Sequence, residues 1–329
     1  MIPLILDGLI LVHKPAQLTS HDVVDSIRNI LKIRKVGHFG TLDPWATGLL
    51  IIAVGKATRL FPLFLQSSKT YESQIRLGWA TDTFDLLGRP TSPQAETFPD
   101  KETILQAMKV FRGNILQVPP LYSAKKHKGK PLYVLARKNQ TIELEPCPVT
   151  VHIFELKFYS PPLLDCVIRC SSGTYIRSLA HDLGQKLGCG AHLVKLVRTS
   201  IDPFDLEESR HLEEIQEKAE KDKIVDVIIP MESLLPHIPK IVLTETGSRM
   251  ARNGNIILPE HILSMYEWPG AKEKPASLGE KLYRLFSEDG RLLAIAKHDI
   301  KKKGLHPFLV IDSENISKYS RRAEEKNVT

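Results

Sequence analysis

One carboxylate in this chain stands in a setting that suits chemistry. Asp43 lies in a loop punctuated by Gly37, Gly40 and Gly48, between an apolar residue and a proline, and the loop runs directly into the apolar stretch Leu49–Val54. A lone acid on a rigid loop at the start of a buried strand is a common way to present a nucleophile or a base. Asp-Pro is also a frequent turn dipeptide, and the loop taken alone favours a structural turn. The rest of the sequence must show whether Asp43 is a catalytic residue or a turn residue.

Two basic clusters could bind a polyanion. The first has tyrosines on either side, and basic side chains interleaved with aromatic rings suit a phosphate backbone whose bases can stack. Solvated loops are the alternative reading of each cluster. The formal net charge of +7 is compatible with a nucleic-acid partner without requiring one. The clusters comprise Tyr122, Lys125, Lys126, Lys128, Lys130 and Tyr133, and then Lys301, Lys302 and Lys303.

Composition excludes several classes of protein. With 329 residues, 42% hydrophobic and 25% charged, the chain fits a globular protein of two domains. No apolar run approaches the ~20 residues that span a bilayer, and the apolar N-terminus lacks the basic start and cleavage site of a signal peptide. We therefore expect a cytoplasmic protein with no membrane segment.

Cysteine and glycine spacing predicts no cofactor. Cys147, Cys166, Cys170 and Cys189 form no C-x-x-C pair, so we expect neither disulfides nor a zinc site. Cys166 and Cys170 are expected to share one face of a strand. The chain also lacks a P-loop and a G-x-G-x-x-G fingerprint.

The elements that must position Asp43 are of mixed α and β type. Thr19 to Asp22 is a capping signature that opens a helix with Val23, Val24 and Ile27 on one face. Residues 71–79 alternate as in a half-buried strand. We further expect strands near residues 8–13, 49–54, 149–158, 163–171 and 192–199, and helices near 58–65, 100–112, 176–187 and 212–223.

The domain organisation follows from proline-rich stretches. We expect a catalytic unit over residues 1–230, interrupted by a proline-rich basic insertion over about 117–148. A smaller unit follows over 235–313, whose short β-rich pieces predict a β-barrel-like module, and the polar residues 314–329 are expected to form a disordered tail.

Taken together and in order, the motifs over residues 8–204 resemble the bacterial tRNA pseudouridine-55 synthases, the TruB family. No single motif would be specific, but the ordered set is. The matching segments are Lys14-Pro15 with Thr19-Ser20; Gly37-His38 with Gly40-Thr41-Leu42-Asp43-Pro44; Lys69-Thr70-Tyr71; Thr81-Asp82-Thr83-Phe84-Asp85; Pro119 to Ala124; Gly173 to Leu179; and Gly190-Ala191-His192 with Leu196 and Arg198.

The resemblance implies an α+β pseudouridine synthase fold, with a mixed, largely antiparallel sheet and a C-terminal RNA-binding module of the PUA type. It implies an isomerase that converts uridine 55 in the T-loop of tRNA to pseudouridine, acting on a flipped-out base. The implied partner is the T stem-loop, gripped by the 117–148 insertion as a thumb that we expect to be mobile without RNA. The implied enzyme is a monomer with no cofactor, metal or obligate protein partner.

The resemblance also implies roles for individual residues. Breaking the N-glycosidic bond builds positive charge on the sugar, which calls for a fixed carboxylate near C1′. Asp43 takes that role as the nucleophile, Arg177 as its ion-pair partner, and Tyr71 as the residue that stacks on uracil and handles a proton. Further substrate contacts are expected from His38, which would occupy the space that the base vacates, and from Tyr175, Leu196, Lys14, Lys125, Lys126, Lys128 and Lys130.

Two positions depart from the family pattern. Gln17 stands where glycine is usual, and Phe39 stands where a small residue is common. Because Phe39 is next to the presumed active loop, its bulk could alter how the loop meets RNA. Two other functions stay open at this level: a tRNA-binding folding chaperone without catalysis, and a guide-RNA-dependent pseudouridine synthase. An N-glycosidase is a more remote third, because it would normally need a second carboxylate to activate water.

Overall fold

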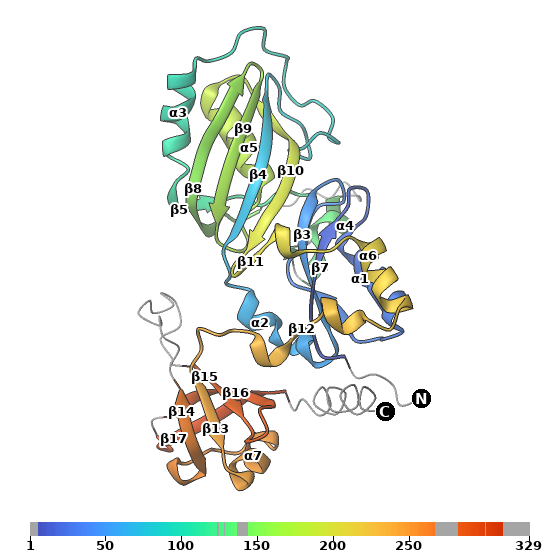
Figure 1. Cartoon of the computed structure of the whole chain (residues 1–329). Coiled ribbons are helices and arrows are strands. Elements are labelled where there is room, and N and C mark those ends of the chain that lie inside the picture. Colours follow the sequence, from blue (N-terminus) through green and yellow to red (C-terminus); the bar gives the residue numbers. More distant parts are fainter. Residues whose placement is uncertain are drawn as a thin grey trace.

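The computed structural model describes residues 6–123, 125–127, 129–136, 144–266, 282–299 and 301–311. The expected tail lies outside these ranges, as do residues 124, 128 and 137–143 of the expected insertion. Within the described part the elements belong to a ten-stranded sheet, a five-stranded sheet, a short two-stranded pair and the helices that cover them (Figure 1).

The ten-stranded sheet is the scaffold of the N-terminal part. Its order is β12-β1-β3-β10-β4-β9-β8-β5, with β2 paired to β3 and β11 to β10. All these pairs are antiparallel except β3 with β10, which confirms the predicted mixed, largely antiparallel sheet. The strands are β1 (Gly8–Lys14), β2 (Val36–His38), β3 (Thr47–Val54), β4 (Lys69–Leu77), β5 (Gly113–Gln117), β8 (Cys147–Ser160), β9 (Leu163–Cys170), β10 (Ala191–Ile201), β11 (Phe204–Asp205) and β12 (Ile229–Pro230).

Helices cover the sheet where the sequence shows amphipathic periodicity. Helix α1 begins with the predicted capping box of Thr19 and Asp22. Helix α3 begins at Asp100, whose carboxylate accepts from Thr103 N at 2.8 Å. The helices are α1 (Ser20–Leu31), α2 (Phe61–Phe64), α3 (Lys101–Lys109), α4 (Leu132–Ala136), α5 (Ile176–Leu187), α6 (Leu212–Glu220) and α7 (Glu245–Arg252). Short 3-10 turns lie at Gly55–Leu60, Leu206–Glu208, Ile224–Val227, Met231–Ser233 and Pro259–His261.

Local sequence patterns predict most of these elements, but some bounds differ. The helix expected near 58–65 is instead a 3-10 turn followed by the single α-helical turn α2. In β9, Cys166 and Cys170 share the buried face, as predicted, and all four cysteines are free thiols. Within the expected insertion the structure describes residues 117–123, 125–127, 129–136 and 144–148, which include the two-stranded pair of β6 (Lys126–His127) and β7 (Lys130–Pro131), followed by α4.

The C-terminal part forms the five-stranded sheet β14-β13-β15-β16-β17. Helix α7 packs against it over Gly247, Ser248 and Ala251, an element that the sequence did not predict. The strands are β13 (Lys240–Leu243), β14 (Ile262–Tyr266), β15 (Leu282–Phe286), β16 (Leu292–Asp299) and β17 (Gly304–Val310). The sheet is a small β-rich unit, and its PUA-type identity stays a prediction.

The parallel pair of β3 and β10 joins the two halves of the large sheet next to the loop that carries Asp43. Gly48 lies opposite Arg198 in this register. A Cβ at Gly48 would approach Arg198 N to 2.6 Å, and the residue has a φ of +109°. Glycine is therefore required where the Asp43 loop enters β3, and Arg198 is carried to the loop by the strand pairing.

Candidate active site

The loop between β2 and β3 presents Asp43 and is fixed along its length. Leu42 N donates to Ser20 Oγ at 2.9 Å, which ties the loop to the first residue of α1. Ala46 N donates to the carbonyl of Asp43 at 3.1 Å and closes a turn. The side chains of Leu42 and Ala46 are buried in the core beneath. Asp43 thereby projects from a rigid turn, with 28% of its side chain exposed.

Lys14 supports this loop from below. Its ammonium group is fully buried and donates to the carbonyl oxygens of Pro15, Leu18 and Pro44 at 2.7 to 3.0 Å. Burial lowers the pKa of Lys14 to about 8. The Lys14 donors are used within the protein, where they hold the residue that follows Asp43, and a contact of Lys14 with substrate stays a prediction.

Arg177 meets Asp43 across the site. Its Nη2 donates to Asp43 Oδ1 at 2.9 Å and to the carbonyl of Tyr122 at 2.9 Å, while Nη1 donates to the carbonyl of Thr83 at 3.1 Å. Only 5% of the Arg177 side chain is exposed. The guanidinium group is thus held from several directions and donates to one oxygen of the Asp43 carboxylate.

Asp85 is a second carboxylate at the same guanidinium group. Its Oδ2 lies 3.4 Å from Arg177 Nη1 and accepts from Trp45 Nε1 at 3.3 Å. Its Oδ1 accepts from Thr83 Oγ1 at 2.6 Å and from Leu87 N at 3.0 Å. Asp85 is buried, so it holds Arg177 rather than meeting solvent. Asp85 belongs to one of the motifs behind the family resemblance, but no local sequence pattern places it in the site.

The electrostatic setting of Asp43 balances opposing effects. Burial raises the pKa of the Asp43 carboxyl, the Arg177 guanidinium opposes that shift, and the nearby Asp85 carboxylate adds to it. A poorly solvated carboxylate interacts more strongly with a developing positive charge than a carboxylate in water does. The site can therefore stabilise a cationic centre brought next to Asp43.

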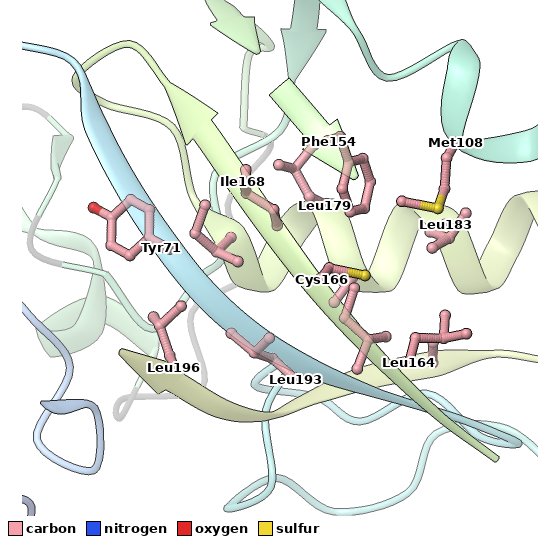
Figure 2. Close-up of a cluster of buried hydrophobic side chains, with 14 of the residues drawn as sticks. Tyr71, Met108, Phe154, Leu164, Cys166, Ile168, Leu179, Leu183, Leu193 and Leu196 are labelled. Carbon is pink, nitrogen blue, oxygen red and sulfur yellow. The ribbon is translucent and has the colours of Figure 1, made fainter. Parts of the chain in front are cut away.

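Tyr71 and Leu196 form an apolar wall beside the loop. Both are buried and belong to the same core cluster. Figure 2 shows Tyr71 at one end of this cluster, next to Leu196, with its hydroxyl group pointing away from the other labelled side chains. Burial raises the pKa of the Tyr71 hydroxyl, and a hydrogen bond with Arg198 opposes the shift. The phenol is thus held neutral at neutral pH, which suits an aromatic surface with a polar edge.

Arg198 links Tyr71 to the Asp43 loop. Its guanidinium group is buried and donates to the carbonyl oxygens of Gly40 at 3.0 Å, Thr41 at 3.4 Å and Leu49 at 2.8 Å. Arg198 belongs to a motif of the family resemblance, but its sequence neighbours suggest no role for it. No local pattern could have shown it, because its partners are backbone atoms that the sheet brings together.

His38, Tyr175 and Lys125 are three further residues expected to contact substrate. His38 is half-buried on β2, its Nδ1 has no partner among the described residues, and burial lowers the pKa of its ring. The backbone of Tyr175 is held at the start of α5 by the Gln117 side chain, through bonds of 2.8 and 3.0 Å. Lys125 donates to Cys147 Sγ at 2.5 Å and lines, with Tyr175, a hollow of about 290 Å³. The side chains of Lys126, Lys128 and Lys130 lie outside the described residues.

The two departures from the family pattern have structural explanations. Gln17 has a φ of +72°, the left-handed conformation that glycine adopts at no cost, and its N–H donates to the carbonyl of Pro44 at 2.8 Å. Phe39 is buried, with 4% exposure, in the core between β3 and α2. Its ring is packed inside the protein and not displayed to a ligand, so the expected effect of its bulk on RNA contact finds no support in its placement.

Among the described residues, no group of three or more His, Cys, Asp or Glu side chains could hold a metal ion. No helix in the described part of the chain is long and apolar enough to cross a membrane.

Comparisons with known proteins agree on one family. Residues 28–176 match the model of the TruB family pseudouridylate synthase N-terminal domain, and residues 177–236 match that of the tRNA pseudouridylate synthase B C-terminal domain. The tRNA pseudouridine synthase B of Solibacter usitatus is 42% identical over 296 residues, covering 89% of this chain and 96% of that protein. The protein of the same name from Thermotoga maritima is 43% identical over 292 residues, covering 88% and 89%.

Solved structures show the same fold. An H/ACA RNP bound to a substrate RNA containing 2′-deoxyuridine has a chain that matches with a TM-score of 0.69 at 24% identity, covering 94% of this chain and 86% of that one. A Cbf5-Nop10-Gar1 complex gives a TM-score of 0.67 at 27% identity, covering 94% and 85%. The predicted pseudouridine synthase fold is thereby confirmed.

Proposed function

This chain belongs to the TruB family of pseudouridylate synthases, and from that premise we propose that it acts on uridine 55 in the T-loop of tRNA. It is a tRNA pseudouridine synthase, an isomerase that converts uridine to pseudouridine, as its relatives over most of the chain are named. Our proposal concerns three further points: the specific T-loop position, the roles of the site residues and the domain organisation.

The proposed chemistry needs a carboxylate next to the sugar. The bond between N1 of uracil and C1′ breaks, the base rotates, and a bond forms between C5 and C1′. C5 loses its proton and N1 gains one, so the product is an isomer and no co-reactant is consumed. Positive charge builds at C1′ as the first bond breaks, and a carboxylate fixed beside it lowers that barrier.

The observation that carries this proposal is the pairing of a buried arginine with a partly open carboxylate. Arg177 Nη2 donates to Asp43 Oδ1 at 2.9 Å, and Asp43 keeps an exposed side for the substrate. We assign Asp43 the role of nucleophile. Tyr71 stacks on the flipped uracil and its hydroxyl handles a proton during the isomerisation. Leu196 packs beside the base, and His38 fills the space that the base leaves.

Substrate recognition is assigned to the basic and modular parts of the chain. Lys125 and the neighbouring lysines contact the stem-loop backbone, Tyr175 contacts a nucleotide near the site, and the segment over about 117–148 acts as the thumb. The five-stranded C-terminal unit serves as a PUA-type RNA-binding module. We propose that the enzyme works in the cytoplasm, where tRNA is processed, as a monomer without a cofactor.

The decisive experiment compares the parent with Asp43→Asn on an unmodified tRNA transcript, with no cofactor added. We expect the parent to form pseudouridine at the T-loop uridine and the variant to form none, while both bind tRNA within about threefold, because Asn keeps the size of the side chain and removes the charge. Asp100→Asn is the matched control, since Asp100 is an exposed helix cap that asparagine can replace.

Other results would point elsewhere. A parent that binds tRNA and forms no product on any tRNA would contradict the proposal and favour a folding chaperone. Product that appears only after a guide RNA is added would favour the guide-dependent alternative. Product at another uridine would overturn the assigned position and leave the isomerase activity standing.

A further inference from the structure

Phe39 belongs to the catalytic loop, and its side chain packs inside a hydrophobic core next to that loop. Its ring stacks on Phe64, with ring centres 5.2 Å apart, and lies 5.6 Å from Phe61. Phe64 in turn stacks on Phe204 at 6.2 Å. These rings come from α2 and β11, elements that do not reach Asp43 themselves.

The same core continues into the C-terminal unit. It includes Phe286, Leu292, Ile295 and Ile311, all at most 2% exposed, together with Phe39. Figure 1 shows α2 between the large sheet and the C-terminal unit, where this core lies. Arg59, just before α2, donates to the carbonyl of Val310 at 2.6 Å and adds a polar tie between the two parts.

On its other side Phe39 is bonded into the site. Its own N–H donates to the carbonyl of Ile51 at 2.9 Å. The carbonyl of the next residue, Gly40, accepts from Arg198 Nη2 at 3.0 Å, and Arg198 also bonds to Tyr71. A shift of the Phe39 backbone would therefore move a partner of Arg198, the residue that also interacts with Tyr71.

We propose that Phe39 is a positioning residue that couples the seating of the C-terminal unit to the geometry of the catalytic loop. A packed aromatic ring transmits displacement because protein interiors have few voids and little compressibility. A small residue at this position would leave a cavity next to Phe64 and let the loop settle independently of the C-terminal unit. The inference rests on the proposed function for its activity readout, but its structural readout is independent of it.

The first test is Phe39→Ala, assayed well below its melting temperature over a series of tRNA concentrations up to saturation. We expect kcat to fall about tenfold or more with KM within about threefold, because a sub-ångström misplacement of the nucleophile slows chemistry without removing an RNA contact. Phe39→Leu, which refills most of the cavity, should recover most of the rate. Ile215→Ala is the control, since Ile215 is fully buried in a different core; it should lower the melting temperature and leave kcat unchanged.

The second test perturbs the C-terminal end of the core and watches the loop. Ile295→Ala and, as a variant without a cavity, Arg59→Ala should each increase amide hydrogen exchange at residues 39–42 in the parent background. In the Phe39→Ala background, neither change should increase exchange further. This readout needs no activity, so it stands even if the parent fails to modify tRNA.

The coupling would be disproved by either of two results. Phe39→Ala that melts earlier but keeps the parent kcat would show that the ring is only structural. Unchanged exchange at residues 39–42 in both Ile295→Ala and Arg59→Ala would show that the C-terminal unit does not communicate with the loop.

Discussion

At the scale of single residues, the site is a set of buried charges that satisfy one another. Arg177 pairs with both Asp43 and Asp85, and Arg198 bonds to backbone carbonyl oxygens and to Tyr71. Asp43 alone among these charged side chains is partly open. Keeping the Asp43 carboxylate ionised in this position costs stability, because burial raises its pKa although Arg177 acts to lower it.

The raised pKa of Asp43 predicts how Asp43→Asn changes stability with pH. Relative to its ordinary value of 3.8, the folded protein holds the Asp43 proton more tightly than the unfolded chain. The parent therefore loses stability as pH rises from 3.8 through the folded pKa, and asparagine, which does not ionise, avoids this loss. Asp43→Asn should melt at a higher temperature than the parent at pH 7, with the difference shrinking toward pH 4. A variant that melts lower at pH 7 would mean that the ion pair outweighs burial.

Arg177→Lys should separate charge from geometry. Lysine keeps the positive charge but cannot bond two carboxylates and two carbonyl oxygens in the plane that the guanidinium group provides. We expect kcat to fall by about 100-fold, with tRNA affinity little changed. Single-turnover kinetics on pre-bound tRNA would check this. A rate within twofold of the parent would show that charge alone suffices.

At the scale of elements, one strand pairing builds the site. Strand β10 runs parallel to β3 and thereby brings Arg198 beneath the loop that precedes β3. Helix α5, whose buried face includes Ile176, Leu179 and Leu183, directs Arg177 at the same loop from the other side. The loop is fixed because elements distant in sequence converge on it.

Gly48→Ala tests this convergence. The added Cβ would collide with the Arg198 backbone, and the φ of +109° is strained for alanine, so we expect a loss of more than about 2 kcal/mol in unfolding free energy. Gly173→Ala is the matched control: its φ of +85° is also positive, but nothing lies within 4 Å of the added Cβ. Chemical denaturation of both variants would separate collision from backbone strain. Equal losses in the two would contradict the role of the strand contact.

At the scale of the whole molecule, the catalytic and C-terminal parts share apolar packing. One core lies under Tyr71, and a second extends from Phe39 to the C-terminal unit. The net charge of +7 acts over the same scale, since it attracts tRNA before any specific contact forms.

Affinity for tRNA should therefore fall steeply with salt, while the rate on bound tRNA should not. Each phosphate contact contributes about −0.7 to −0.9 to the slope of log affinity against log salt. Lys125→Ala should reduce the magnitude of that slope by about one such contact. Lys221→Ala, which removes an exposed ammonium group paired with Glu217 on α6, should leave the slope unchanged. Filter binding over a series of salt concentrations would show this, and equal slopes for the parent and Lys125→Ala would remove Lys125 from the interface.

Elements that form through contacts between neighbours along the chain could be predicted from the sequence alone. The capping box at Thr19, the alternation from Tyr71 to Leu77 and the glycine-punctuated loop around Asp43 are short-range patterns, and each predicts its element directly. The ordered motifs also identified the family and its candidate residues. Helix α7 was missed because its buried face is Gly247, Ser248 and Ala251, small residues that form no stripe of large apolar side chains.

Contacts between side chains that are far apart in the sequence became known only from the tertiary structure. Asp43 and Arg177 are 134 positions apart, and their 2.9 Å contact depends on strand order and register, which local periodicity does not encode. The burial of Lys14, the second carboxylate at Asp85 and the packing of Phe39 away from the site follow from the same cause. A side chain's chemistry is set by its residue type, but its partners are set by packing between elements that the sequence places far apart.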